Sequence, residues 1–155
     1  MTDFEQLKPE TVTFLRSKFA RGPVSKHLRL ALETIEKGHV TMRMPKSEKI
    51  TNLGGNVHGG MVAALVDAAS AVAAWATDEV KAGTRGITVG FSISYVGPTS
   101  DTDLVADCRI VSQGGTLTIV DVEVFNDSGQ VAAKAVVTYK LDLARDRRIA
   151  RDSRY

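Results

Sequence analysis

The chain has 155 residues, of which 43% are hydrophobic and 25% charged, and a formal net charge of +2. This length and composition suit a soluble globular protein, and a charge this small argues against a nucleic-acid-binding protein, which would spread basic charge over a folded face. Residues 144–155 contain five Arg and two Asp. We therefore expect a single domain over residues 1–143, including an N-terminal helix, followed by an Arg-rich C-terminal tail in solvent.

Two features of the sequence favour a cytoplasmic protein. The N-terminal residues lack the basic and then apolar pattern of a signal peptide. Cys108 is the only cysteine, so no internal disulfide can form and a reducing compartment is the default. The apolar run over residues 61–77 is short for a membrane span and contains Asp67. We expect no association with a membrane.

Hydrophobic periodicity predicts a helix, a β-hairpin, a second and longer helix, and four antiparallel strands. The glycine pairs and the Gly-Pro pairs mark the turns between them. In chain order, the predicted elements are a helix at 9–20 ended by Gly22-Pro23, hairpin strands at 28–35 and 39–44, a polar loop at 46–60, a helix at about 60–77, and a strand meander at 87–95, 104–110, 117–125 and 131–141. One sheet curled around the long helix would bury the apolar residues, which predicts an α+β fold.

The long helix carries one charge that packing alone would not select. Between Met61 and Ala76 the only polar side chains are Asp67 and Ser70. A helix that is apolar all round is normally buried, and a buried carboxylate is costly unless another group compensates it. Asp67 is therefore the first candidate for a catalytic residue. The alternative is a buried structural Asp that neighbouring hydroxyls or a partner chain's amide satisfy.

The loop that leads into this helix is the second candidate. The N–H groups of Gly59 and Gly60 lie at the predicted helix start, where they lack intrahelical partners and the helix dipole adds positive charge. Such amides can stabilise a carbonyl oxygen that acquires negative charge. Glycine pairs at this position also serve turns and packing. Asn52 and His58 could orient a water molecule or the substrate, or could cap and shape the loop.

The spacing of these candidates along the sequence bears on whether one subunit or two form the site. Asp67 lies seven residues beyond Gly60 and nine beyond His58. This separation is roughly 10–13 Å along the axis of an α-helix, which rises about 1.5 Å per residue. One carbonyl group cannot contact both the Gly59 amide and the Asp67 carboxylate of the same chain. If both groups serve one reaction, the helix start of one subunit must meet Asp67 of another, as in a two-fold dimer with antiparallel helices.

The remaining reactive side chains are expected to be structural. Cys108 alternates with apolar residues on one strand face and should belong to the core. His27, His39 and His58 show no metal-ligand spacing. The chain has neither a phosphate-binding loop motif nor a Gly-x-Ser-x-Gly elbow. We expect no metal ion and no cofactor.

The pattern Asn52-x5-His58-Gly59-Gly60-x6-Asp67, followed by Gly97-Pro98 and the strands, resembles the hotdog-fold acyl-CoA thioesterases. The most similar branch is the phenylacetate-pathway (PaaI-like) type, and the resemblance covers roughly residues 22–142. It implies the hotdog fold, in which an antiparallel β-sheet is wrapped around a long central helix. It also implies a homodimer or a homotetramer built from two dimers. The implied reaction is hydrolysis of an acyl- or aryl-acyl-CoA to the free acid and CoA, in which CoA is part of the substrate.

The same resemblance implies roles for individual residues. Asp67 would be the general base or the nucleophile, and the Gly59 amide would donate to the thioester oxygen. Asn52 would position the lytic water or the carbonyl group, and His58 would shape the loop and help position the site. Thr88, early in the first strand after the helix, would assist Asp67 through its hydroxyl group. Gly60 would contact the substrate.

The family often has Gly-Asp where this chain reads Ser100-Asp101-Thr102-Asp103, a departure in a loop. Arg residues of the tail or of exposed strand faces are expected to hold the CoA phosphates. The rival functions are a non-catalytic acyl-CoA sensor or binding module of the same fold, and a purely structural or interaction protein.

Overall fold

The structure, a computed structural model, describes residues 4–143; the Arg-rich tail lies outside the described residues. The helices are α1 (Pro9–Ala20), α2 (Pro23–His27), the short 3-10 helix η1 (Glu48–Ile50) and α3 (Gly59–Trp75). The strands are β1 (Ala31–Glu36), β2 (His39–Met44), β3 (Arg85–Tyr95), β4 (Leu104–Gly114), β5 (Leu117–Asn126) and β6 (Val131–Asp142). No helix within this range is long and apolar enough to cross a membrane.

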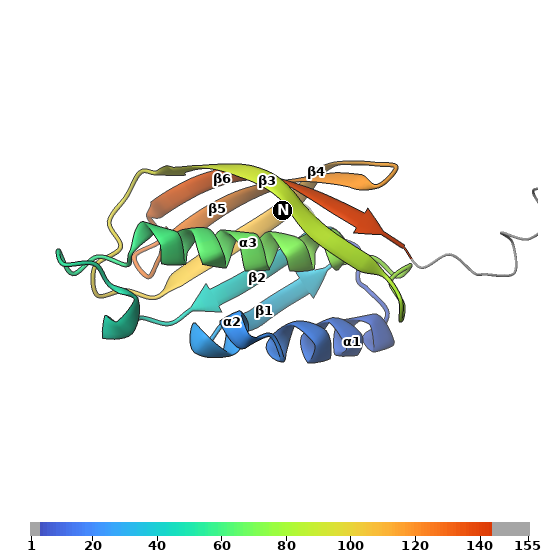
Figure 1. The fold of residues 1–155 in the computed structure, drawn as a ribbon, viewed down its shortest axis with the longest axis horizontal. Coiled ribbons are helices and arrows are strands. Elements are labelled where there is room, and N and C mark those ends of the chain that lie inside the picture. Colours follow the sequence, from blue (N-terminus) through green and yellow to red (C-terminus); the bar gives the residue numbers. More distant parts are fainter. Residues whose placement is uncertain (1–3, 144–155) are drawn as a thin grey trace, which may run out of the picture.

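The six strands form one antiparallel sheet in the order β1-β2-β4-β5-β6-β3 (Figure 1). The predicted strands are all present, but the prediction that β3 begins a continuous meander was wrong. Only β4, β5 and β6 follow one another, and β3 pairs with β6, as in the register Ile93 with Ala135. Alternation along a strand indicates which face is buried but not which strand lies next to it. The sequence therefore left the neighbour of β3 undetermined.

Gly97 shows how the chain leaves β3. Its N–H donates to the carbonyl oxygen of Ala132 at 3.1 Å, and a Cβ atom at this position would lie 2.2 Å from the carbonyl oxygen of Val131. Only glycine permits this approach of one backbone to another. The end of β3 is thereby tied to the start of β6, and the chain then crosses to β4 at the interior of the sheet.

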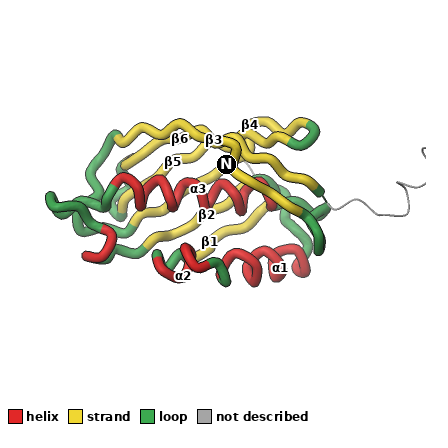
Figure 2. Tube along the Cα trace, in the orientation of Figure 1, coloured by secondary structure: helices red, strands yellow, loops and turns green. Residues whose placement is uncertain are grey.

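The helices lie on one face of the sheet (Figure 2). α3 packs against β2, β3, β4, β5 and β6, and α1 lies beside α3 next to β1 (Figure 1). The side chains between α3 and the sheet are fully buried, among them Leu65, Val66, Val120, Val122 and Val137. Cys108 belongs to this core, as predicted, and its burial raises the pKa of the thiol far above the ordinary value. The predicted arrangement of one antiparallel sheet around one apolar helix is confirmed.

The helix α2 was not predicted. Gly22-Pro23 does end α1, but Pro23 is also the first residue of α2. Proline suits this position, because the first N–H of a helix has no intrahelical acceptor and the ring fixes a helical φ. β1 consequently begins at Ala31 rather than at Leu28, which caps α2 and is buried.

Candidate active site

Asp67 lies near the middle of α3, on the side of the helix that the sheet does not cover. Its neighbours on that side are Met61, Ala64, Ala68 and Ala71, and all five residues are only half-buried. The sequence predicted a helix buried all round, and the prediction was wrong for this stripe. The physical reason is that one sheet covers one side of a helix, so that the other side needs another partner.

Thr88 of β3 is the hydrogen-bond donor to Asp67. Its Oγ1 lies 2.6 Å from Oδ1 of Asp67, although the two residues are 21 positions apart. In the sheet register Thr88 lies opposite Tyr139, and a bulge follows before Gly90. Oδ2 of Asp67 accepts no hydrogen bond from another described residue. One carboxylate oxygen is therefore held in place, and the other can contact a reactant.

The start of α3 is capped by His58, which has the extended backbone expected of an N-cap residue. Its Nδ1 accepts a hydrogen bond from the Gly60 N–H at 3.0 Å, and its carbonyl oxygen accepts from the N–H groups of Met61 and Val62. The Gly59 N–H donates to no other described residue. Both glycine amides were expected to lack partners; the structure leaves only that of Gly59 available to a ligand.

Tyr95 at the end of β3 reaches the same helix start, a contact that sequence reasoning missed. Its hydroxyl group donates to the carbonyl oxygen of Gly59 at 2.9 Å. A Cβ atom on Gly59 would lie 3.3 Å from the Tyr95 ring. The alternation of residues 87–95 placed Tyr95 on a strand face, but nothing in the sequence indicated that this strand end meets the helix. β3 thus contacts both the Asp67 region and the Gly59 region of α3.

Asn52 organises the loop before α3. Its side-chain oxygen accepts hydrogen bonds from the N–H groups of Gly54 at 2.9 Å and Asn56 at 3.2 Å. Asn52 and His58 also line one wide, open hollow, whereas Asp67 is not among its lining residues. Within one chain, the predicted site residues therefore form two groups. One contains Asp67 and Thr88, and the other contains Asn52, His58 and the two glycines.

A buried aromatic pair lies close to the first group. The indole N–H of Trp75 donates to the hydroxyl oxygen of Tyr139 at 3.0 Å, and both side chains are buried. A Cβ atom on Gly86 would lie 2.6 Å from the Tyr139 hydroxyl oxygen. Only a residue without a side chain therefore fits beside Trp75 and Tyr139 at this position. Burial raises the pKa of Tyr139, the hydrogen bond from Trp75 opposes this, and the charge of Asp67 raises it further. No pattern in the sequence indicated this pair.

Comparisons with known proteins agree with this architecture. The model of the thioesterase superfamily matches residues 54–133, which include Gly59, Asp67 and Thr88. Human acyl-coenzyme A thioesterase 13 is 32% identical over 99 residues, which are 63% of this chain and 69% of that protein. The family predicted from the motif is confirmed by these matches.

The solved structures that resemble this fold include the following two. A Streptococcus mutans protein bound to acetyl-CoA shares 31% sequence identity, with a TM-score of 0.67 over 76% of this chain and 91% of that one. The E. coli PaaI protein, from the phenylacetic acid degradation operon, shares the fold at 18% identity, with a TM-score of 0.75 over 84% of this chain and 92% of that one. The sheet wrapped around α3 is the hotdog fold, and the chain belongs to the thioesterase superfamily of thioester hydrolases.

Proposed function

We propose that this chain hydrolyses the thioester bond of an acyl- or aryl-acyl-CoA at a site shared by two copies of the chain. The observation that carries the proposal is the position of Asp67, which is oriented by Thr88 on an uncovered stripe of α3. The available amide of Gly59 is eight residues before Asp67 in the sequence. That separation is about 12 Å along the helix axis. The name of the human relative and the acetyl-CoA in the Streptococcus mutans structure support the substrate class.

In this proposal each group has one role in the reaction. The Gly59 N–H of one subunit donates to the thioester oxygen as negative charge develops there. The free oxygen of Asp67 in the other subunit attacks the carbonyl carbon, or removes a proton from the water that attacks it. Attack by Asp67 breaks the carbon–sulfur bond and leaves an acyl–Asp67 anhydride, which water then hydrolyses to the free acid. Attack by water breaks the same bond and gives the free acid directly. In both routes the CoA thiolate leaves and takes up a proton, so the products are the free acid and CoA. Asn52 positions the water or the carbonyl, and the bare backbone at Gly60 leaves room for the substrate. The chemistry calls for no cofactor.

The exposed surface beside Asp67 supports a homodimer. β3 is an edge strand of eleven residues, and its exposed apolar side chains include Ile87, Val89 and Phe91. A long apolar edge strand promotes unwanted pairing unless another chain covers it. A two-fold axis near β3 would cover this edge and bring two α3 helices side by side in antiparallel orientation. Family resemblance extends the proposal to a homotetramer made of two such dimers.

Asp67→Asn tests the role of the carboxylate. We expect kcat for acyl-CoA hydrolysis to fall at least about 100-fold, because a general base or a nucleophile is lost. The matched control is Asp121→Asn, which changes an exposed acid on β5. Thiol release from a panel of aryl, short-chain and long-chain acyl-CoAs measures the rates and also defines the acyl preference. Turnover by Asp67→Asn at the parental rate would overturn the assignment, and tight binding without turnover by the parent would favour a sensor.

Gly59→Pro tests the amide. Gly59 is the first residue of α3, and His58 before it has φ −61° and ψ 133°. Proline permits this conformation in the residue that precedes it, and it is well suited to the first position of a helix. The substitution therefore removes the N–H group while the helix start is kept. Gly59→Ala is the control, since it adds a Cβ atom beside Tyr95 but retains the N–H. We expect kcat to fall about 10- to 100-fold more in the proline variant than in the alanine variant.

A mixed dimer tests whether the site is shared. A dimer of one Gly59→Pro subunit and one Asp67→Asn subunit would contain one site with both defects and one site with neither. We expect such mixed dimers, separated by two affinity tags, to recover about half of the parental activity. If each site were built within one chain, both sites would carry one defect and activity would stay at the level of the single variants. A chain that is monomeric by light scattering would also contradict the shared site.

A further inference from the structure

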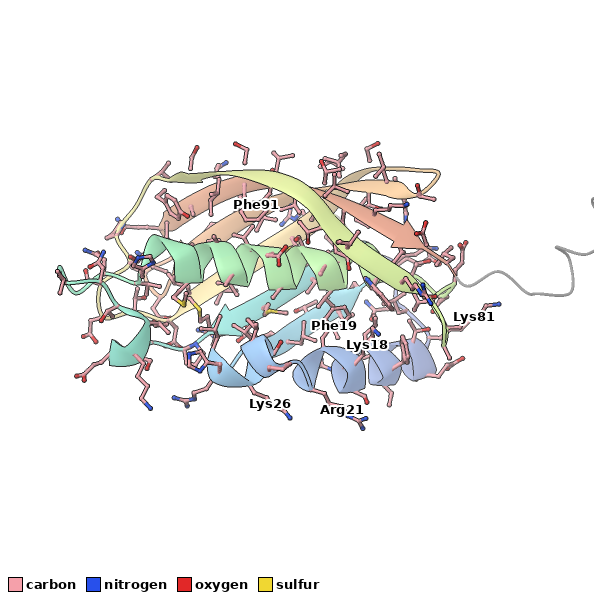
Figure 3. The ribbon with its side chains drawn as sticks, in the orientation of Figure 1. Lys18, Phe19, Arg21, Lys26, Lys81 and Phe91 are labelled. Carbon is pink, nitrogen blue, oxygen red and sulfur yellow. The ribbon has the colours of Figure 1, made fainter. Side chains whose placement is uncertain are left out.

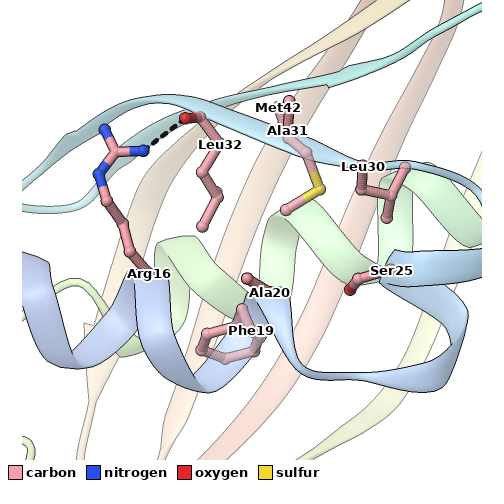
Figure 4. A pocket seen from close by; sticks show the side chains of 8 residues that line it. All are labelled: Arg16, Phe19, Ala20, Ser25, Leu30, Ala31, Leu32 and Met42. Atoms are coloured by element: carbon pink, nitrogen blue, oxygen red, sulfur yellow. Dashed lines mark hydrogen bonds between the residues drawn. The ribbon is translucent and has the colours of Figure 1, made fainter.

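A pocket of about 190 Å³ lies at the sheet edge opposite to β3, between the helices α1 and α2 and the strands β1 and β2 (Figure 4). Its apolar lining includes Phe19, Leu30, Leu32 and Met42. None of these side chains contributes to the candidate active site. The pocket is therefore a separate feature of the fold, on the far side of α3 from the uncovered edge strand.

The pocket has an ordered polar boundary. The guanidinium group of Arg16 donates to the carbonyl oxygens of Leu32 at 2.6 Å and Glu33 at 3.2 Å, which ties α1 to β1 across the pocket (Figure 4). Ser25 of α2 contributes a hydroxyl group to the lining. An apolar cavity of about 150 Å³ in another protein is large enough to bind benzene. This pocket can accordingly hold an aromatic ring or a short aliphatic chain.

Residues 16–30, which contribute five of the eight residues that line the pocket, form a strongly basic segment. Residues 16–30 contain no Asp or Glu and five basic residues, which are Arg16, Lys18, Arg21, Lys26 and Arg29. None of the five forms an ion pair with another described residue, and the nearby Glu33 is paired with Arg43. The side chains of Arg21 and Lys26 extend outward from the α1–α2 layer (Figure 3). An apolar pocket beside a segment of this charge suits a ligand with an apolar end and an anionic head.

Phe19 connects the pocket to the interior. Its ring lies edge-on to the ring of Trp75, with 5.8 Å between the ring centroids, and Trp75 donates its hydrogen bond to Tyr139. Lys18 lies over the same indole ring at 4.6 Å. Trp75 is the only tryptophan of the chain. A ligand that moves Phe19 would thus change the surroundings of the one indole group.

We propose that this pocket binds the apolar end of an anionic amphiphile, a carboxylate with about six to eight carbon atoms, and that the positive charge of segment 16–30 attracts its carboxylate group. Binding requires neither Asp67 nor a second copy of the chain. If the proposed hydrolysis is correct, the ligand belongs to the same chemical class as the acid that the enzyme releases. The pocket would then be a second site for that product.

The test uses sodium octanoate and the full chain carrying Asp67→Asn, with Trp75 fluorescence and calorimetry as the two readouts. We expect saturable binding of one octanoate per chain. Ala20→Leu and Ala31→Leu each add volume at a lining residue that is exposed, and each should weaken binding at least 10-fold. Ser17→Leu, an exposed position on α1 outside the pocket, is the matched control and should leave the affinity unchanged.

Further titrations separate the contribution of the ligand's alkyl group to binding from the contribution of its negative charge. Octanol should bind at least 10-fold more weakly than octanoate, and the double variant Arg21→Gln/Lys26→Gln should weaken octanoate but not octanol. CoA without an acyl chain should leave the Trp75 signal unchanged. The proposal is overturned if octanoate binding does not saturate, if Ala20→Leu and Ala31→Leu bind like Ser17→Leu, or if CoA alone competes with octanoate. Each result is independent of the hydrolysis rates that test the proposed function.

Discussion

The hydroxyl oxygen of Thr88 lies 2.6 Å from Oδ1 of Asp67, which joins the edge strand β3 to the central helix. Seven residues later on the same strand, Tyr95 donates to the carbonyl oxygen of Gly59. β3 therefore aligns two parts of α3 that the proposed reaction uses in different sites. A movement of this edge strand would alter the orientation of the carboxylate and the position of the amide together.

Thr88→Val should reduce hydrolysis without a matching loss of binding. The valine keeps the shape of threonine and removes the hydroxyl group that orients Asp67. A hydrogen bond to a charged group is worth about 1.5–3 kcal/mol, so we expect kcat to fall about 10-fold or more. Steady-state kinetics should show KM nearly unchanged, and Thr88→Ser should restore most of kcat. A loss in KM alone, or no rescue by serine, would contradict the positioning role.

His58→Ala should weaken the start of α3. The substitution removes the ring nitrogen that accepts the Gly60 N–H. Loss of an N-cap side chain costs about 1 kcal/mol. Urea unfolding of the two proteins measures this difference in free energy. His58→Asn provides another side chain that caps helices well and should recover most of the stability. The capping role would be disproved if alanine and asparagine gave the same midpoint.

Gly97→Ala should destabilise the fold strongly. The new Cβ atom would lie 2.2 Å from the backbone oxygen of Val131, so the end of β3 and the start of β6 would have to separate. We expect a loss of about 2 kcal/mol or more in the free energy of unfolding. Gly90→Ala is the matched control on β3, because a Cβ atom there meets no atom within 4 Å. Equal losses in the two variants would show that the close approach at Gly97 is unimportant.

Because of Tyr139, the free energy of unfolding should fall as the pH becomes alkaline. Burial raises its pKa in the folded state, which therefore disfavours the tyrosinate. An unfolded tyrosine has a pKa of about 10, so this stabilising contribution is complete below about pH 10 and is lost as the pH rises through the pKa of the folded state. As the pH rises above about 10, Tyr139→Phe should therefore lose less stability than the parent.

Urea midpoints at each pH measure that difference, and the tyrosinate absorbance of the native protein gives an independent titration. Tyr95→Phe is the control, since Tyr95 is exposed. It should retain the alkaline loss of stability seen in the parent. If the stability of Tyr139→Phe falls as steeply as that of the parent, the slope arises from other groups.

Patterns within the sequence predicted most of the elements and supplied the candidate residues of the proposed site. The apolar run around Asp67 identified the central helix, and strict alternation identified the strands, because both periods are local properties of the chain. The spacing of Gly59 and Asp67 led to the hypothesis of a site shared by two subunits, because the rise of a helix is constant. Thr88 came from the family motif, and its contact with Asp67 is seen in the structure.

Other features depend on which distant segments meet, and only the tertiary structure decided them. The pairing of β3 with β6 brings Thr88 to Asp67 and Tyr95 to Gly59, yet alternation is the same whichever strand lies alongside. Contact between α1 and the end of α3 brings Phe19 to Trp75 and leaves a pocket beside β1. The sequence determined the local periods and the spacing along α3. The tertiary structure decided which strands and side chains lie next to one another, because contacts between distant residues depend on how all the apolar faces are buried at once.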